Sequence, residues 1–176
     1  MEIYLIRHTT PKVEKGICYG QSDLELANSF TEEVELVLKQ LPKQFDVVYS
    51  SPLKRCKQLA KKIDQNCISE NRLMELNFGD WEMQKWDDIP LSEIQPWYAD
   101  FVNTPALNGE SYIALNVRVL EFYNSVVLNS KHQKIAIVTH SGVIRSLLAK
   151  IRGIALEDSF NLITINYGSV VKIKTR

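Results

Sequence analysis

The sequence predicts an α/β fold: a three-layer structure in which a mostly parallel central sheet has helices on both faces. Residues 3–6 and 134–139 are short, uninterrupted apolar runs, as expected for strands that are covered on both faces. Segments with the apolar spacing of amphipathic helices follow the predicted strands. Strands that alternate with helices along a chain are typical of a mostly parallel sheet.

The first half of the chain contains two predicted strand–helix units. A helix is expected to begin near Thr31, because two acidic residues occupy the turn that follows it. Residues 45–50 predict a second strand. Ser51 is expected to cap the next helix, with Pro52 at its first position, where a missing N–H costs nothing.

The second half of the chain repeats this alternation. Residues 110–128 form a long amphipathic pattern that predicts a helix, and another helix is expected after the strand at 134–139. Residues 161–166 and 169–174 predict two final strands with a glycine-containing turn between them.

Composition and charge limit the classes of partner. Lysine plus arginine number 21, aspartate plus glutamate also number 21, and the formal net charge is zero. A nucleic-acid or membrane-surface binder needs a basic surplus, so neither partner is expected.

The three cysteines form no paired motif, and no apolar run approaches the ~20 residues of a membrane span. Free thiols and the lack of an evident signal peptide favour the cytoplasm. The oligomeric state stays open, a homodimer included.

Polar side chains follow three of the predicted strands. Arg7 and His8 follow the first strand, Arg55 lies shortly after the second, and His140 follows the strand at 134–139. Ligands of open α/β sheets bind beyond the carboxyl ends of the strands, so these groups should meet at one edge. Arginine and helix N-termini both bind phosphate oxygens. The sequence therefore predicts a site for a phosphoryl group.

The histidines at this edge have two other interpretations. A lone histidine at a strand end is usually a polar cap, but two of the chain's three histidines arrive here, each with an arginine. A metal site would need further histidine, cysteine or carboxylate ligands at suitable spacing, and none stands beside His8 or His140. We therefore expect neither a metal nor another cofactor.

Residues 1–176 are expected to form a single domain, because 176 residues suit one domain and no linker or repeat divides them. The segment at about 70–109 differs from the rest, since it holds all three tryptophans and several prolines. We interpret it as a cap-like insertion over the edge of the sheet where the site lies. Trp81 and Trp86 would either line a substrate pocket or pack inside the insertion.

Five segments together resemble a known family: LIRHTTP, YSSPLKRCKQLA, MELNFGDWE, NGES and IVTHSGVIRSLL. Their order and spacing resemble the histidine phosphatase superfamily, which has the phosphoglycerate mutase-like fold, and the resemblance spans most of the chain. RHTTP followed by GICYGQSDLEL is most similar to the alpha-ribazole phosphatase subgroup. That resemblance implies a metal-independent phosphomonoesterase that removes the 5′-phosphate of alpha-ribazole phosphate, a small-molecule substrate, in cobalamin biosynthesis.

The resemblance also implies a role for each site residue. His8 would be the nucleophile and would become a phosphohistidine. Glu75 would protonate the leaving oxygen and then activate water, although Glu82, seven residues on, is a rival for this role. Four groups would hold the phosphoryl oxygens: Arg7, Arg55, His140, which would add charge if protonated, and the backbone N–H of Ser141.

Further positions are expected near the substrate or depart from the superfamily's pattern. Tyr19 and Gln21, in the first loop, are candidate substrate contacts. Ser141 and Met83 stand where the superfamily often has glycine, and Ser141 would be strained if its backbone needed a positive φ. The chemical roles of the threonines after His8 stay open.

Three other functions remain compatible with the sequence. One is a histidine phosphatase of broad specificity, and another is a phosphoglycerate mutase, for which the chain is short. The third is a non-catalytic phosphate-binding regulatory module, against which the intact set of His8, Arg55, Glu75 and His140 argues.

Overall fold

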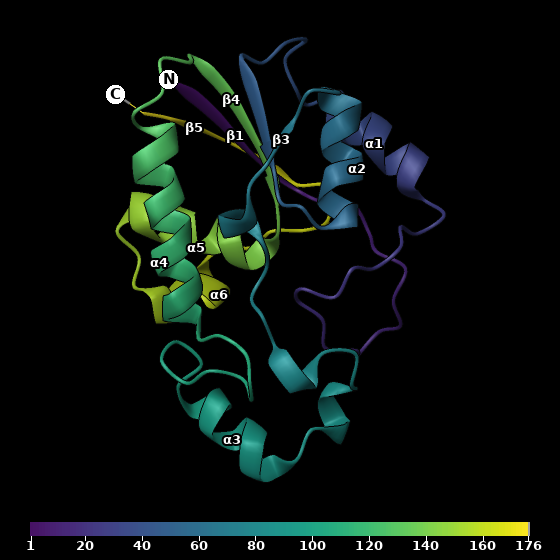
Figure 1. Ribbon diagram of the computed structural model, residues 1–176, viewed down its shortest axis with the longest axis vertical. Coiled ribbons are helices and arrows are strands. Elements are labelled where there is room, and N and C mark those ends of the chain that lie inside the picture. Colours follow the sequence, from purple (N-terminus) through teal and green to yellow (C-terminus); the bar gives the residue numbers. More distant parts are fainter. Residues whose placement is uncertain (176) are drawn as a thin grey trace.

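The computed structural model describes residues 1–175 of the chain. At its centre lies a sheet with the strand order β3-β2-β4-β1-β5 (Figure 1). The strands are β1 (Glu2–Arg7), β2 (Val47–Ser50), β3 (Ile68–Ser69), β4 (Lys134–Thr139) and β5 (Val170–Lys174). β1 pairs in parallel with β4 and antiparallel with β5, while β2 pairs in parallel with both β3 and β4. The prediction of a mostly parallel sheet is confirmed.

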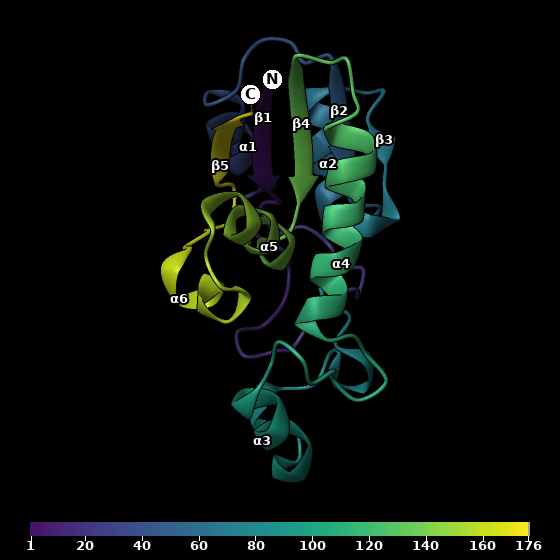
Figure 2. The same ribbon diagram turned by 90° about the vertical axis from the view of Figure 1, so that its left-hand side faces the viewer.

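Helices cover both faces of this sheet, as Figures 1 and 2 show. The helices are α1 (Phe30–Leu38), α2 (Lys54–Ile63), α3 (Leu91–Ala99), α4 (Tyr112–Phe122), α5 (Ser141–Arg152) and α6 (Ser159–Leu162). A π-helical stretch, Tyr123–Val127, extends α4 to nearly the length that the sequence predicts. No helix within residues 1–175 is long and apolar enough to cross a membrane.

Alternate residues of the central strands face opposite layers, which explains their uninterrupted apolar runs. Ile3 and Leu5 belong to the same buried cluster as α4 and α5, whereas Tyr4 and Ile6 belong to the cluster with α1 and α2. A strand that is covered on both faces must be apolar at every position. The buried strands β1 and β4 therefore form a rigid support for the polar residues that follow them.

Residues 70–109 lie beyond the carboxyl ends of β1 and β4, in the part of the molecule that contains α3 (Figure 2). This segment shares a small core of its own with the first loop: Cys18, Trp81, Ile89, Ile94 and Ala106. Three short 3₁₀ turns, Asn71–Leu73, Gly79–Trp81 and Trp86–Asp88, precede α3. The segment thus covers the edge of the sheet where the strands end.

Two local predictions are wrong. Residues 161–166 form no strand, because 161 and 162 end α6 and the carbonyl groups of Ile163 and Ile165 accept hydrogen bonds from arginine side chains. Both isoleucines are buried and the residues that follow each of them are exposed. Buried and exposed residues therefore alternate here although the segment pairs with no strand within residues 1–175. The helix after β2 begins at Lys54 and not at Pro52, because the backbone of Leu53 is extended. The two-residue strand β3 was also not predicted.

Candidate active site

His8 follows the last residue of β1 and is almost completely buried. Its Nδ1 lies 2.7 Å from the Thr9 carbonyl oxygen, which can only accept a hydrogen bond. Nδ1 therefore carries the proton and Nε2 keeps its lone pair. Burial and the nearby charges of Arg55 and Arg7 lower the pKa of His8 well below 6.5, although the bond to Thr9 opposes them. His8 is thus a neutral imidazole with a free ring nitrogen.

Two arginines lie beside His8 without a carboxylate partner among residues 1–175. Arg7 Nη1 donates to the Ile165 carbonyl at 2.7 Å, and its guanidinium carbon lies 3.9 Å from the centre of the Tyr167 ring. Arg55, in the first turn of α2, is fully buried and donates to the carbonyl groups of Gly20 and Ser22.

The Nε atoms of Arg7 and Arg55 are both buried and have no hydrogen-bond partner within the described residues. A buried cation without a counter-ion is unfavourable, and so is a buried donor without an acceptor. An anion between the two guanidinium groups would relieve both costs. The anion would also offset the unfavourable interaction between the Arg55 cation and the positive N-terminal end of the α2 dipole.

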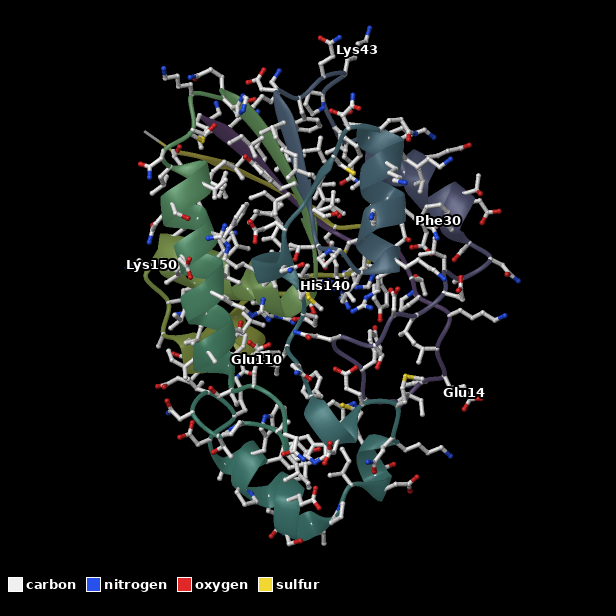
Figure 3. All side chains as sticks on the ribbon, in the orientation of Figure 1. Glu14, Phe30, Lys43, Glu110, His140 and Lys150 are labelled. Carbon is white, nitrogen blue, oxygen red and sulfur yellow. The ribbon has the colours of Figure 1, made fainter. Side chains whose placement is uncertain are left out.

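His140 lies at the end of β4 and immediately precedes α5. Figure 3 labels it near the middle of the molecule. Its ring is 5.1 Å from the His8 ring, and its Nε2 is 2.8 Å from Ser51 Oγ. Burial, followed by Arg55, His8 and Arg7, lowers the pKa of His140 well below 6.5. This lowering favours a neutral His140 in the ligand-free protein.

The structure separates the two candidate glutamates. The Glu75 carboxylate lies beside the start of α5, where it accepts from the Gly142 N–H at 3.1 Å, and it lines a cavity together with His8. Glu82 instead accepts from the backbone N–H groups of Gln21 and Ser22, which tie the first loop to the 70–109 segment. Burial raises the pKa of Glu82, but hydrogen bonds from the Ser22 hydroxyl and from the backbone N–H groups of Gln21, Ser22 and Phe78 outweigh burial, so the pKa is lowered. Glu82 is held as an ionised structural carboxylate.

The cavity lined by His8 and Glu75 has a volume of about 190 Å³. Its polar lining comes from Arg7, His8, Arg55, Glu75 and Ser141. The rest of its wall is apolar or aromatic, apart from Gly142: Ile17, Tyr19, Leu76, Phe78, Trp86, Tyr112 and Phe160. Charged and aromatic side chains thus line the same cavity. Within residues 1–175, no group of three or more histidine, cysteine, aspartate or glutamate side chains could hold a metal ion.

The two candidate contacts from the first loop have different environments. Tyr19 lines the cavity, and its hydroxyl oxygen lies 2.5 Å from that of Tyr167. Gln21 is not among the lining residues, since its side-chain amide donates to the Glu75 carbonyl oxygen at 3.0 Å. Trp86 lines the cavity, whereas Trp81 is buried and donates to Glu93.

Sequence reasoning missed several residues of the site. Tyr112 belongs to the apolar stripe of α4, and nothing in the stripe indicates that its hydroxyl donates to the Gly142 carbonyl oxygen. Tyr167 falls in the predicted turn between residues 161–166 and 169–174, and Phe160 directly precedes the first of these predicted strands. Ser51 was interpreted only as a helix cap, and its hydrogen bond to His140 could not be foreseen from the chain order.

Comparisons with known proteins agree with this geometry. Residues 3–176 match the family described as histidine phosphatase superfamily (branch 1). The chain is 30% identical to the adenosylcobalamin/alpha-ribazole phosphatase of Salmonella typhimurium, with 86% of this chain and 79% of that protein covered. It is 29% identical to a putative phosphoserine phosphatase 2 of Hydrogenobacter thermophilus, with 94% and 86% covered.

A solved structure of a related protein also has the same fold as this chain. The alpha-ribazole phosphatase of Shigella flexneri has a TM-score of 0.89 and 26% identity to this chain, with 100% of this chain and 91% of that chain covered. The chain therefore belongs to the histidine phosphatase superfamily. It is a phosphoric monoester hydrolase.

Proposed function

We propose that this hydrolase works without a metal and through a phosphohistidine at His8. The observation that carries the proposal is the free Nε2 of a neutral, buried His8 beside the unpaired guanidinium groups of Arg7 and Arg55. A neutral imidazole can attack phosphorus, and preorganised cations stabilise the charge on the phosphoryl oxygens.

In the first step, His8 Nε2 forms a bond to phosphorus as the bond between phosphorus and the ester oxygen breaks. The departing oxygen takes a proton from Glu75, which lies on the same cavity. The phosphoryl oxygens are held by Arg7, Arg55, His140 and the backbone N–H of Ser141. His140 contributes a hydrogen-bond donor, and the two arginines contribute fixed positive charge.

In the second step, water attacks the phosphorus of the phosphohistidine. Glu75, now a carboxylate, accepts a proton from this water, and the bond between phosphorus and Nε2 breaks. Inorganic phosphate leaves, and both His8 and Glu75 return to their starting forms.

We further propose that the substrate is alpha-ribazole phosphate, whose 5′-phosphate is removed in cobalamin biosynthesis. Its leaving group is an alcohol that carries an aromatic base. The aromatic wall of the cavity, where the rings of Phe78 and Trp86 pack together, suits such a group. The alpha-ribazole phosphatases among the relatives support the same substrate.

Relatives that are named phosphoserine phosphatases suggest a smaller, charged leaving group. The cavity favours this alternative less. Among residues 1–175, Arg7 and Arg55 are the only cations that line it, and both lie beside His8. A leaving group with a carboxylate, as in phosphoserine or phosphoglycerate, would meet apolar walls. The same observation argues against a phosphoglycerate mutase.

We propose that residues at about 70–109 act as a cap-like insertion within a single domain. The segment supplies Glu75 for proton transfer, together with Phe78 and Trp86 for the aromatic wall. A non-catalytic phosphate-binding module would have no use for a carboxylate at this place.

A phosphate-release screen tests the substrate proposal. The esters would be alpha-ribazole phosphate, phosphoserine and 3-phosphoglycerate, with isomer formation measured for the last. We expect the highest kcat/KM for alpha-ribazole phosphate. Trp86→Ala should lower this value more than the value for phosphoserine, while Tyr98→Ala, at an exposed position of the same segment, should change neither. A preference for phosphoserine would contradict the substrate and leave the phosphohistidine step standing.

A further inference from the structure

The guanidinium group of Arg118, in α4, uses all of its donors close to the active site. Its Nε and Nη2 donate to the two carboxylate oxygens of Glu110, at 2.9 and 2.7 Å. Its Nη1 donates to the carbonyl oxygens of Arg72 and Met74, at 2.8 and 2.7 Å. The remaining Nη2 donor reaches the carbonyl oxygen of Glu75 at 3.0 Å. Five N–H groups therefore meet five acceptors.

Glu110 extends this arrangement along the chain. It is the glutamate of the NGES segment and lies just before α4, where Figure 3 labels it. Besides Arg118, its Oε2 accepts from the backbone N–H of Asn77 at 2.9 Å. The side chains of Arg118 and Glu110 are only 20% and 17% exposed. One bidentate ion pair thus holds both ends of the 72–77 segment.

The segment that carries Glu75 has no regular structure of its own. It runs between the 3₁₀ turns Asn71–Leu73 and Gly79–Trp81, so neither a helix nor a strand satisfies its backbone groups. The carbonyl groups of 72, 74 and 75 are satisfied by a side chain instead. Gln21 Nε2 also donates to the Glu75 carbonyl oxygen, at 3.0 Å.

We infer that Arg118, oriented by Glu110, is a positioning residue for Glu75: it fixes the backbone of residues 72–75 so that the carboxylate faces the leaving oxygen. The inference rests on the proposed role of Glu75 in proton transfer. It also gives the NGES segment a function, because Glu110 orients Arg118 while Ser111 caps α4 by accepting from the Ala114 N–H. Arg118 itself does not line the cavity, and it reaches the site only through the backbone of Glu75.

Dependence on the leaving group distinguishes this role from a general structural one. A phenolate such as p-nitrophenolate departs without a proton, whereas an alkoxide needs one. We therefore measure the rate of the first, phosphoryl-transfer step for p-nitrophenyl phosphate and for propyl phosphate. Arg118→Met should slow this step for propyl phosphate about 10-fold or more, and for p-nitrophenyl phosphate less than about 3-fold.

A second measurement asks whether Arg118 acts through Glu75. In a Glu75→Gln background the proton donor is already absent, so Arg118→Met should add little further slowing with propyl phosphate. The matched control is Arg72→Met, which removes ion pairs to Glu70 and Glu121 on the surface beside the same segment. This control should show no selectivity for the leaving group.

Each other outcome overturns the inference. Equal slowing of both esters would make Arg118 a structural residue only, and so would full additivity with Glu75→Gln. No slowing of either ester would leave it without a role in the reaction. If Arg118→Met does not fold, Arg118→Lys and Glu110→Gln test the same selectivity. If wild-type protein releases no phosphate from either ester, the proposed function fails first, and that result is distinct from equal slowing.

Discussion

Gly142 lies directly against the Glu75 carboxylate: a methyl group built on its Cα would come within 2.3 Å of Glu75 Oε1. Its N–H also donates to Glu75 Oε2 at 3.1 Å. The glycine of the THSG segment therefore has two effects. It leaves space for the carboxylate, and it supplies a donor that orients it.

Gly142→Ala should displace the Glu75 carboxylate from its place in the cavity. Proton transfer to the leaving oxygen contributes about 10²–10⁴-fold in enzymes, so we expect at least about 10-fold slower turnover of alkyl phosphates. Turnover of p-nitrophenyl phosphate is the internal control and should change much less. An alanine variant with wild-type rates on both esters would show that Glu75 does not need this contact.

The two glutamates should respond differently to substitution. Glu75→Gln should slow hydrolysis of alkyl phosphates by about 10²-fold or more, with little loss of stability. Glu82→Gln removes a charged acceptor of several backbone N–H groups, so it should lower the free energy of unfolding by about 1–3 kcal/mol. Urea unfolding and steady-state rates of both variants check this, and the reverse pattern would assign the proton to Glu82.

Stability should depend on pH through His8 and His140. Both are buried as neutral imidazoles with pKa values well below 6.5, mainly because of burial, with Arg55 and Arg7 as the nearest cations. Below about pH 6.5 the unfolded chain therefore binds more protons than the folded protein, and the free energy of unfolding must fall as pH falls.

The slope should approach about 1.4 kcal/mol per pH unit for each histidine. Urea unfolding between about pH 7 and 5 measures it, with His8→Asn expected to flatten part of the slope. A wild-type stability that stays level or rises over this interval would contradict the burial of neutral histidines.

Met83 should be a site where glycine stabilises the protein. Its φ is 68°, a left-handed conformation that costs a side chain roughly 1–2 kcal/mol, and its own side chain is mostly exposed. Met83→Gly should raise the free energy of unfolding by about 0.5–1 kcal/mol, after the larger entropy of an unfolded glycine is subtracted. Lys85→Gly, at a φ of −71°, is the matched control and should be destabilising. A less stable Met83→Gly variant would contradict the assignment of strain.

The charged half of the site could be predicted because the geometry of a parallel sheet is simple. Arg7 ends β1, and His8 and His140 directly follow β1 and β4, so chain order alone brings them to one edge. Arg55 could be predicted to join them because it lies in the first turn of the helix after β2. Met83 and Ser141 both stand where the superfamily often has glycine, but their backbones differ. Met83 has a positive φ, whereas Ser141 begins α5 without one.

The aromatic half and the supports of Glu75 could not be predicted. Tyr112 and Arg118 both lie on α4, where helical spacing distinguishes the buried face from the exposed one but not which polar tip reaches a neighbouring loop. Ile163 and Ile165 alternate like a strand, yet their carbonyl groups meet Arg145 and Arg7. Such contacts depend on how distant segments pack, which local patterns do not record.

The most direct test of the account is to trap the phosphoryl group on the protein. Wild-type and Glu75→Gln protein would be mixed with a phosphate ester and quenched under alkaline conditions, because phosphohistidine is labile to acid. Mass spectrometry of the digested chain would then locate the added group. We predict a phosphoryl group on His8 in both proteins and its complete absence, together with activity, in His8→Ala. Wild-type turnover by His8→Ala, or a phosphoryl group on another residue, would contradict the central claim.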